Sequence, residues 1–164
     1  DVTFGVAPAT IIFAQLSVME YPAAIECLRP ILPFFAFVVA AFSALRLAKF
    51  NLDERQTTSF IGLPTPANAL FWGSLLATHN DWFEGSAYML PVMLVMIVLS
   101  SWLLICELPM FALKFKHWGW KDNEVKYSFA IASVLAIIVF GPLTSFWGII
   151  LAYIVVSGVL KVKK

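Results

Sequence analysis

Apolar residues fall in five long blocks along the chain, separated by short polar connections. The first four blocks cover residues 3–19, 31–50, 63–78 and 88–111, and each approaches the roughly 20 residues that a helix needs to span a bilayer. The fifth, residues 127–160, is too long for one helix at about 1.5 Å per residue across a hydrocarbon core of about 30 Å. Gly141-Pro142 lies near its middle, so we expect two helices there. The pattern predicts an all-α integral membrane protein, a bundle of about six transmembrane helices.

Basic residues lie almost entirely on one side of this arrangement, as they do in cytoplasmic loops. With the amino end inside, only Arg29 lies outside, and a single last span would move three lysines to the outer face. An even number of spans is therefore favoured. The inner basic residues are Arg46, Lys49, Arg55, Lys114, Lys116, Lys121, Lys126, Lys161, Lys163 and Lys164.

Composition agrees with a membrane protein and excludes some alternatives. Hydrophobic residues make up 61% and charged residues 13%, against about 25% charged in soluble domains. A net charge of +1 without a basic helix gives no reason to expect a nucleic acid partner. Without a linker or repeat, residues 1–164 are predicted to form a single transmembrane domain. Cys27 and Cys106 would lie toward opposite faces, so no disulfide and no zinc site is expected.

The candidate chemistry lies at the inner end of the second block. Arg46 and Lys49 are three residues apart and share a helix face, and an ionisable group at this depth is costly unless it reaches water, a partner or a ligand. A polar connection with Asn51, Arg55 and Thr58 follows. Arg suits bidentate binding of phosphate or carboxylate, and Lys acts as a point charge. The pattern thus favours an anion site, and ordinary snorkelling of inner cations is the alternative.

Three segments resemble a known family: Asp-Val-Thr-Phe-Gly-Val-Ala-Pro-Ala at residues 1–9, Leu-Arg-Leu-Ala-Lys-Phe-Asn at 45–51 and Gly-Leu-Pro-Thr-Pro at 62–66. They are similar to the CDP-alcohol phosphatidyltransferases, and within them to the bacterial CDP-diacylglycerol–serine O-phosphatidyltransferases. The family signature holds four aspartates, and Asp1 matches the last. Since the other three would precede Asp1, we expect a fragment of an eight-helix protein, inactive alone, that lacks the upstream helices of the family core.

The resemblance implies transfer of a phosphatidyl group from CDP-diacylglycerol to L-serine, with release of CMP. It implies Mg²⁺ or Mn²⁺ held by aspartates, which stabilises charge on the nucleotide and the transferred phosphate. Asp1 would be a metal ligand, the general base for the serine hydroxyl, or both; the alternative is a solvated carboxylate at a helix amino terminus. The substrate-binding candidates are Arg46, Lys49, Asn51, Arg55 and Thr58.

The resemblance also implies a homodimer in the bacterial cytoplasmic membrane, in contact with membrane lipids and with its active site on the cytoplasmic face. Two alternatives stay open. A sibling transferase would use the same metal site with glycerol 3-phosphate, inositol phosphate or choline as acceptor. A transporter or scaffold without enzymatic activity needs only hydrophobic spans and a basic inner face.

Overall fold

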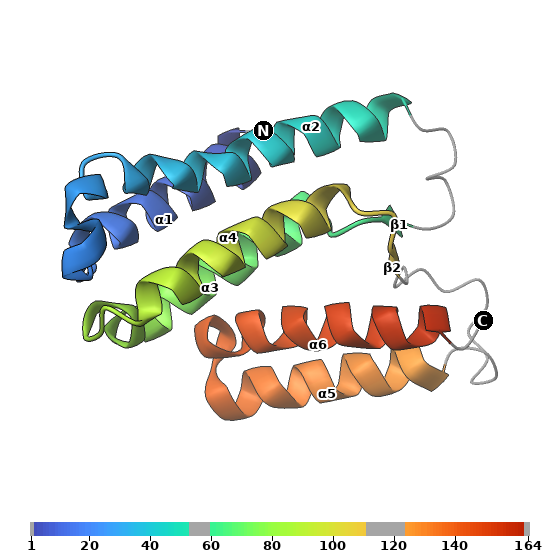
Figure 1. Cartoon of the computed structure of the whole chain (residues 1–164). Helices are drawn as coiled ribbons and strands as arrows, with labels where there is room; N and C mark the ends of the chain where they lie inside the picture. Colours follow the sequence, from blue (N-terminus) through green and yellow to red (C-terminus); the bar gives the residue numbers. More distant parts are fainter. Residues whose placement is uncertain (1, 53–59, 111–123, 163–164) are drawn as a thin grey trace.

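The computed structural model of the 164-residue chain describes residues 2–52, 60–110 and 124–162. In these residues the fold is all-α, as predicted. The one addition is a pair of two-residue strands. The six α-helices lie roughly side by side, joined at alternate ends (Figure 1). They are α1 (Ala7–Val18), α2 (Phe37–Leu52), α3 (Thr65–Glu84), α4 (Met89–Ile105), α5 (Glu124–Phe140) and α6 (Pro142–Val162).

Short helical turns flank the first two helices. A π-helical segment, η1 (Val2–Val6), leads into α1, and two 3₁₀ segments, η2 (Ala23–Leu28) and η3 (Leu32–Ala36), connect α1 to α2. Pro8 and Pro33 each stand at the start of a helical segment, where a missing N–H costs little. The first two apolar blocks are therefore helical as expected, although neither is one uniform α-helix.

The predicted break of the fifth block is confirmed. Helix α5 ends at Phe140, α6 begins at Pro142, and Gly141 between them has a φ of +82°, a left-handed conformation that glycine adopts without steric cost. The Ser145 hydroxyl of α6 donates a 2.8 Å hydrogen bond to the Ala136 carbonyl of α5. The two helices form a closed hairpin.

The fourth apolar block was predicted to be helical up to residue 111, and this was wrong, because α4 ends at Ile105. The chain becomes extended at Cys106, with a ψ of 152°, and continues into β2 (Pro109–Met110), which pairs antiparallel with β1 (Phe60–Ile61). Residues 106–110 are apolar except for Glu107. Hydropathy alone therefore did not distinguish a continued helix from an extended segment here.

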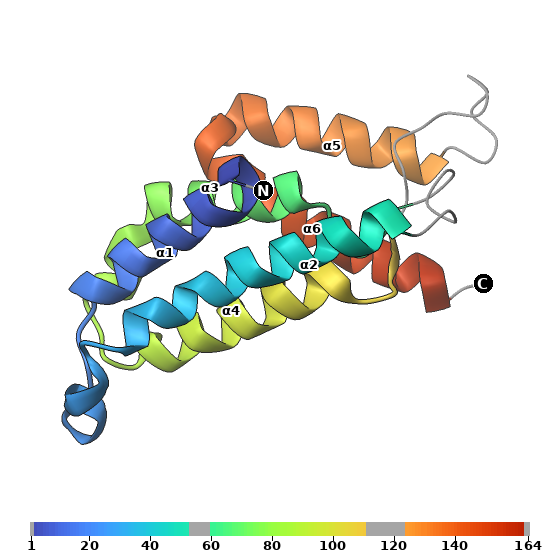
Figure 2. The same cartoon turned by 90° about the horizontal axis from the view of Figure 1, so that it is seen from above.

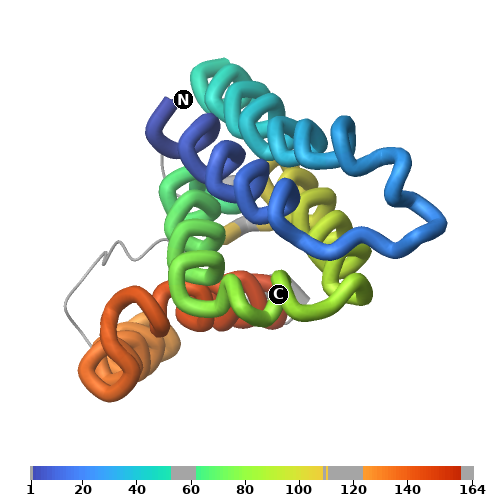
Figure 3. Tube along the Cα trace, turned by 90° about the vertical axis from the view of Figure 1, so that its left-hand side faces the viewer, coloured from blue at the N-terminus to red at the C-terminus, as the bar shows by residue number. Residues whose placement is uncertain are grey.

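The core lies among α1 to α4, with α6 packed against α3 from one side. Helix α5 packs chiefly against α6, and Figures 2 and 3 show it at the outer edge of the bundle. No residue of α5 is buried. The interior is filled by side chains that are fully shielded from solvent: Ile12, Leu16, Trp72, Leu90, Met93 and Ile97.

Two helical stretches in the described residues are long and apolar enough to cross a membrane: Leu32–Leu52 and Pro142–Val159. Two others, Val2–Val18 and Met89–Ile105, are apolar but shorter. Over an 18-residue apolar segment of each longer stretch, only 28% and 17% of the residues are buried within the protein. Most of their apolar surface therefore faces outward.

Candidate functional site

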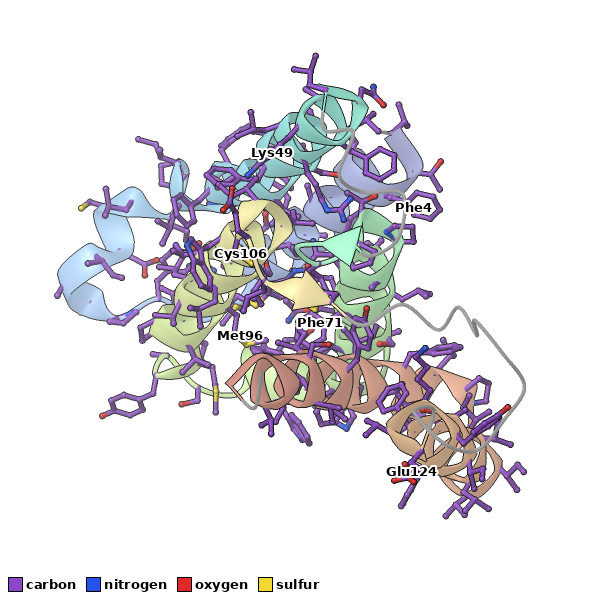
Figure 4. The ribbon with its side chains drawn as sticks, turned by 90° about the vertical axis from the view of Figure 1, so that its right-hand side faces the viewer. Phe4, Lys49, Phe71, Met96, Cys106 and Glu124 are labelled. Carbon is purple, nitrogen blue, oxygen red and sulfur yellow. The ribbon has the colours of Figure 1, made fainter. Side chains whose placement is uncertain are left out.

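Three segments distant in sequence meet at one end of the bundle: the end of α2, the Gly62 loop after β1, and the end of α4. The Gly62 amide donates to the Leu108 carbonyl at 2.9 Å, and the Leu63 amide donates to the Leu103 carbonyl at 2.8 Å. Figure 4 looks onto this end, where Lys49 of α2 lies close to Cys106, directly after α4. The backbone of the loop is thus fixed to α4, and α2 lies over the junction.

Gly62 permits this junction in two ways. Its φ is +75°, and a Cβ built there would lie 2.8 Å from the Leu104 carbonyl oxygen and 2.9 Å from that of Cys106. Real Cβ atoms are essentially never that close to another heavy atom. Only glycine both adopts the left-handed backbone and leaves room for the end of α4.

Arg46 reaches this junction from α2 and is 8% exposed. One terminal nitrogen, Nη2, donates a long hydrogen bond of 3.4 Å to the Gly62 carbonyl, and the buried Nε has no partner. Among the described residues no carboxylate lies within ion-pairing distance of it. A buried guanidinium with unused donors is costly unless an anion meets it, so the anion site expected at Arg46 stays a prediction that this geometry allows.

Lys49 lies one turn further along α2 and reaches the same junction. Its Nζ donates to the Ile105 carbonyl at 3.3 Å and lies 3.6 Å from Oε1 of Glu107. Ile105 ends α4, where backbone carbonyls lack helical partners and carry partial negative charge. The prediction that Lys49 and Arg46 share a face is confirmed, and both hold backbone carbonyls of neighbouring segments.

The other predicted site residues are not all placed together. Asn51 is exposed near the end of α2, and its side chain makes no hydrogen bond to another described residue. Asp1, Arg55 and Thr58 lie outside the described residues. The segment directly after Asp1, η1, packs against α2 and α3.

Sequence reasoning missed Tyr153 and Cys106. Both lie near the Arg46 guanidinium, and Cys106 is buried, with its thiol donating to the Leu103 carbonyl at 3.2 Å. Tyr153 comes from α6, about a hundred residues after Arg46 in the chain. The apolar pattern of α6 gives no sign of which helix it contacts, so no signal for Tyr153 existed. Cys106 was predicted to lie toward the inner end of its span; in the structure it directly follows the end of α4, and the side of the membrane stays a prediction.

The opposite end of the bundle holds Arg29, the third Lys or Arg residue in the described part of the first half of the chain. Arg29 pairs with Glu26 at 2.8 Å, both about half exposed, and lies over the ring of Tyr21. Burial raises the pKa of the Tyr21 hydroxyl, and the nearby Arg29 opposes that shift. Arg29 has a carboxylate partner and Arg46 has none among the described residues, so the two arginines are chemically distinct.

Metal ligands are not gathered in the described part of the chain. No group of three or more His, Cys, Asp or Glu side chains there lies close enough to hold a metal ion. The described residues therefore do not fit the implied Mg²⁺ or Mn²⁺ by themselves. What they offer at this end of the bundle is the unused donor of Arg46 and the amine of Lys49.

Comparisons with known proteins add no relative. A scan of the chain against protein-family models found no match, and a search of curated proteins found no similar sequence.

Proposed function

We propose that the protein is an integral membrane transferase that makes phosphatidylserine from CDP-diacylglycerol and L-serine, releasing CMP. The single observation that carries this is the contact between two segments of the family resemblance. Arg46, in Leu-Arg-Leu-Ala-Lys-Phe-Asn, donates to the carbonyl of Gly62, which opens Gly-Leu-Pro-Thr-Pro. Two motifs that resemble one family thus form one polar junction.

Membrane placement is supported by the outward-facing apolar helices. Leu32–Leu52 and Pro142–Val159 each have the length and hydropathy of a span, and both end in or near basic residues of the predicted inner face. We place the active site on the cytoplasmic face of a bacterial cytoplasmic membrane. A homodimer within the bilayer is part of the proposal, on the resemblance alone.

In this proposal Arg46 binds a phosphate of the CDP-lipid or the carboxylate of serine. Its unpaired Nε and the weakly engaged Nη2 form one edge of the guanidinium, which suits an oxyanion in a bidentate arrangement. Lys49, more exposed, adds positive charge at the mouth of the site. Asn51, Arg55 and Thr58 stay proposed substrate-binding residues.

Asp1 is proposed as a metal ligand, a general base or both, with Mg²⁺ or Mn²⁺ completed by aspartates that the family signature places before it. When bound, such an ion would stabilise charge on the phosphates. The described residues contribute binding and orientation of the substrate rather than metal ligation.

The test is CMP release by the product of the complete reading frame in detergent, with CDP-diacylglycerol and Mn²⁺. L-Serine is compared with glycerol 3-phosphate, inositol phosphate, choline and no acceptor. Serine-dependent release supports the proposal. Release with another acceptor indicates a sibling transferase, and no release with any acceptor favours a transporter or scaffold.

Arg46→Lys tests the site itself, with Arg29→Lys as the matched control at the opposite end. We expect Arg46→Lys to lower CMP release roughly ten- to a hundredfold, because one charge-assisted bidentate contact is lost, with its thermal stability measured in parallel. Arg29→Lys is expected to leave release unchanged. Equal activity of the two variants would refute the role of Arg46.

A further inference from the structure

A cavity of about 330 Å³ lies between α3, α4 and α6, within the range of about 300–1,000 Å³ typical of ligand pockets. Figure 4 shows two of its lining residues, Phe71 of α3 and Met96 of α4, close to α6. Its walls are mainly aliphatic and aromatic. The apolar lining includes Leu63, Phe71, Met96, Leu99, Leu151 and Ile154.

Two polar residues, Asn68 and Ser100, interrupt this lining, and they differ in their hydrogen bonds. Asn68 is 0% exposed, and neither its Oδ1 nor its Nδ2 has a hydrogen-bond partner. A buried amide without partners is costly, because it lost its hydrogen bonds to water and gained none. Ser100, the other polar lining residue described, already accepts from Trp72 Nε1 at 3.2 Å and donates to the Ile97 carbonyl. The unused hydrogen-bonding capacity of the cavity is thus concentrated at Asn68.

The cavity opens sideways. Helix α3 packs against both α4 and α6, whereas α4 and α6 form no extensive contact of their own in the described residues. At the rim, Leu99 of α4 is 53% exposed and Leu151 of α6 is 42% exposed. In a membrane this opening would face lipid rather than water.

The distance of Asn68 from the start of α3 corresponds to the level of the ester carbonyls of a lipid. The backbone N–H of Asn68 donates to the Pro64 carbonyl in the first turn of α3, about 5 Å from the helix start at 1.5 Å per residue. Phe71 lies one turn deeper. With α3 starting at the inner interface, the polar end of the cavity lies where headgroup region meets hydrocarbon, and the apolar part extends inward.

We propose that this cavity binds one acyl chain of a diacyl glycerolipid, with Asn68 Nδ2 donating a hydrogen bond to the ester carbonyl. One chain suits a volume near the lower limit for ligand pockets, and the second chain stays in the bilayer. Leu63, which lines the cavity, directly follows Gly62, the residue that accepts from Arg46. A lipid held here would have its headgroup on the same side of the bundle as Arg46. The inference rests on the membrane placement proposed above and not on the transfer reaction.

The experiment compares ester and ether lipids bound to the delipidated protein in native mass spectrometry. Diacyl phosphatidylglycerol competes with dialkyl phosphatidylglycerol of the same chain length, which lacks only the carbonyls. A second arm repeats this with CDP-diacylglycerol and its dialkyl analogue. We expect ester lipids to be retained about three- to tenfold over ether lipids, the effect of one hydrogen bond.

A preference for ester over ether lipids with both headgroups assigns the cavity to membrane lipids in general. The same preference with the CDP-lipid alone assigns it to the transferase donor. Both outcomes support the inference. Equal retention of ester and ether lipids with both headgroups overturns it, whether or not CMP release is observed. Ester preference without CMP release would refute the transferase proposal alone.

Variants locate the effect. Asn68→Leu, similar in size, is expected to abolish the ester preference, and Asn80→Leu on the same helix outside the cavity is expected to retain it. Leu99→Trp at the rim is expected to remove one bound lipid of either kind by filling the opening. An ester preference that survives in Asn68→Leu would overturn the assignment. If that variant fails to fold, the comparison of ester with ether lipids on the unaltered protein still decides.

Discussion

Helix α4 and helix α5 are equally long, 17 residues each, and both are strongly apolar, yet they are used differently. Six residues of α4 are buried, whereas α5 buries none and packs chiefly against α6. Ile97 of α4 is fully buried, and Ile138 of α5 is 73% exposed. Apolar composition is therefore common to both helices and does not tell which one holds the bundle together. Neither belongs to the two stretches of the described residues that are long and apolar enough to cross a membrane.

The hydrogen bonds of serine hydroxyls distinguish α4 from α5 more clearly than hydropathy does. In α4, Ser100 accepts from Trp72 of α3, which links two helices. In α5, the hydroxyls of Ser128 and Ser133 donate to carbonyls of their own helix, four residues earlier. A polar group that bonds across helices adds to packing in an apolar medium, and one that bonds within its helix does not.

The largest expected effect is that of Gly62→Ala, which would test the junction of the α1 to α4 group. The new Cβ would meet two carbonyl oxygens at 2.8 and 2.9 Å and a third at 3.2 Å, and a left-handed conformation costs alanine about 1–2 kcal/mol by itself. We expect a loss of more than about 3 kcal/mol in the free energy of unfolding, or no folded protein. Thermal unfolding in detergent measures it.

Gly141→Ala is the matched control, because Gly141 also has a positive φ but no atom within 4 Å of a built Cβ. Its cost is expected to be the conformational part alone, about 1–2 kcal/mol. If both variants lost the same stability, backbone conformation and not the close approach of α4 would account for the effect at Gly62.

The second prediction is a pair of identical truncations, Ile97→Ala in α4 and Ile138→Ala in α5. Ile97→Ala leaves a cavity in a packed interior and is expected to destabilise the protein by about 2 kcal/mol or more. Ile138→Ala removes a side chain that contacts little protein and is expected to change stability by under about 0.5 kcal/mol. Equal effects, measured by unfolding in the same detergent, would mean that α5 is packed against a partner in solution.

The sequence predicted those features of the fold that depend on neighbouring residues in the chain. Apolar block length predicted the six α-helices of the described residues, and Gly141-Pro142 predicted the hairpin, because these features act locally. Residues 106–110 were predicted to be helical, but they form an extended segment that ends in β2. A strand of two residues is too short to show a periodic pattern in the sequence.

The candidate site was predictable in part for the same reason. Arg46 and Lys49 share a face because helical spacing requires it. Tyr153 and Asn68 were not recognised, because their importance comes from which helices pack together: α6 brings Tyr153 to Arg46, and the space beside α6 leaves Asn68 unpaired. Asp1, Arg55 and Thr58 stay predictions.

The third prediction concerns the link between α3 and α4. Ser100→Ala removes the acceptor of the Trp72 indole N–H, which is fully buried, and is expected to cost about 1 kcal/mol. Ser133→Ala in α5 removes a hydroxyl bonded only within its own helix and is expected to cost less than about 0.5 kcal/mol. A larger loss in Ser133→Ala than in Ser100→Ala, by thermal unfolding, would contradict the distinction between the two helices.

The smallest effect is expected at the surface of the same junction, where Lys49 pairs with Glu107. Their side chains are 41% and 70% exposed and their charged atoms are 3.6 Å apart, so Glu107→Gln is expected to cost at most about 0.5–1 kcal/mol, and less at high salt. A double-mutant cycle with Lys49→Gln, followed by thermal unfolding at low and high salt, measures the coupling. Lys49 also donates to the Ile105 carbonyl, which Glu107→Gln leaves intact. A coupling above about 2 kcal/mol would mean that charge holds α2 to α4, whereas a small one leaves that role to the backbone bonds around Gly62.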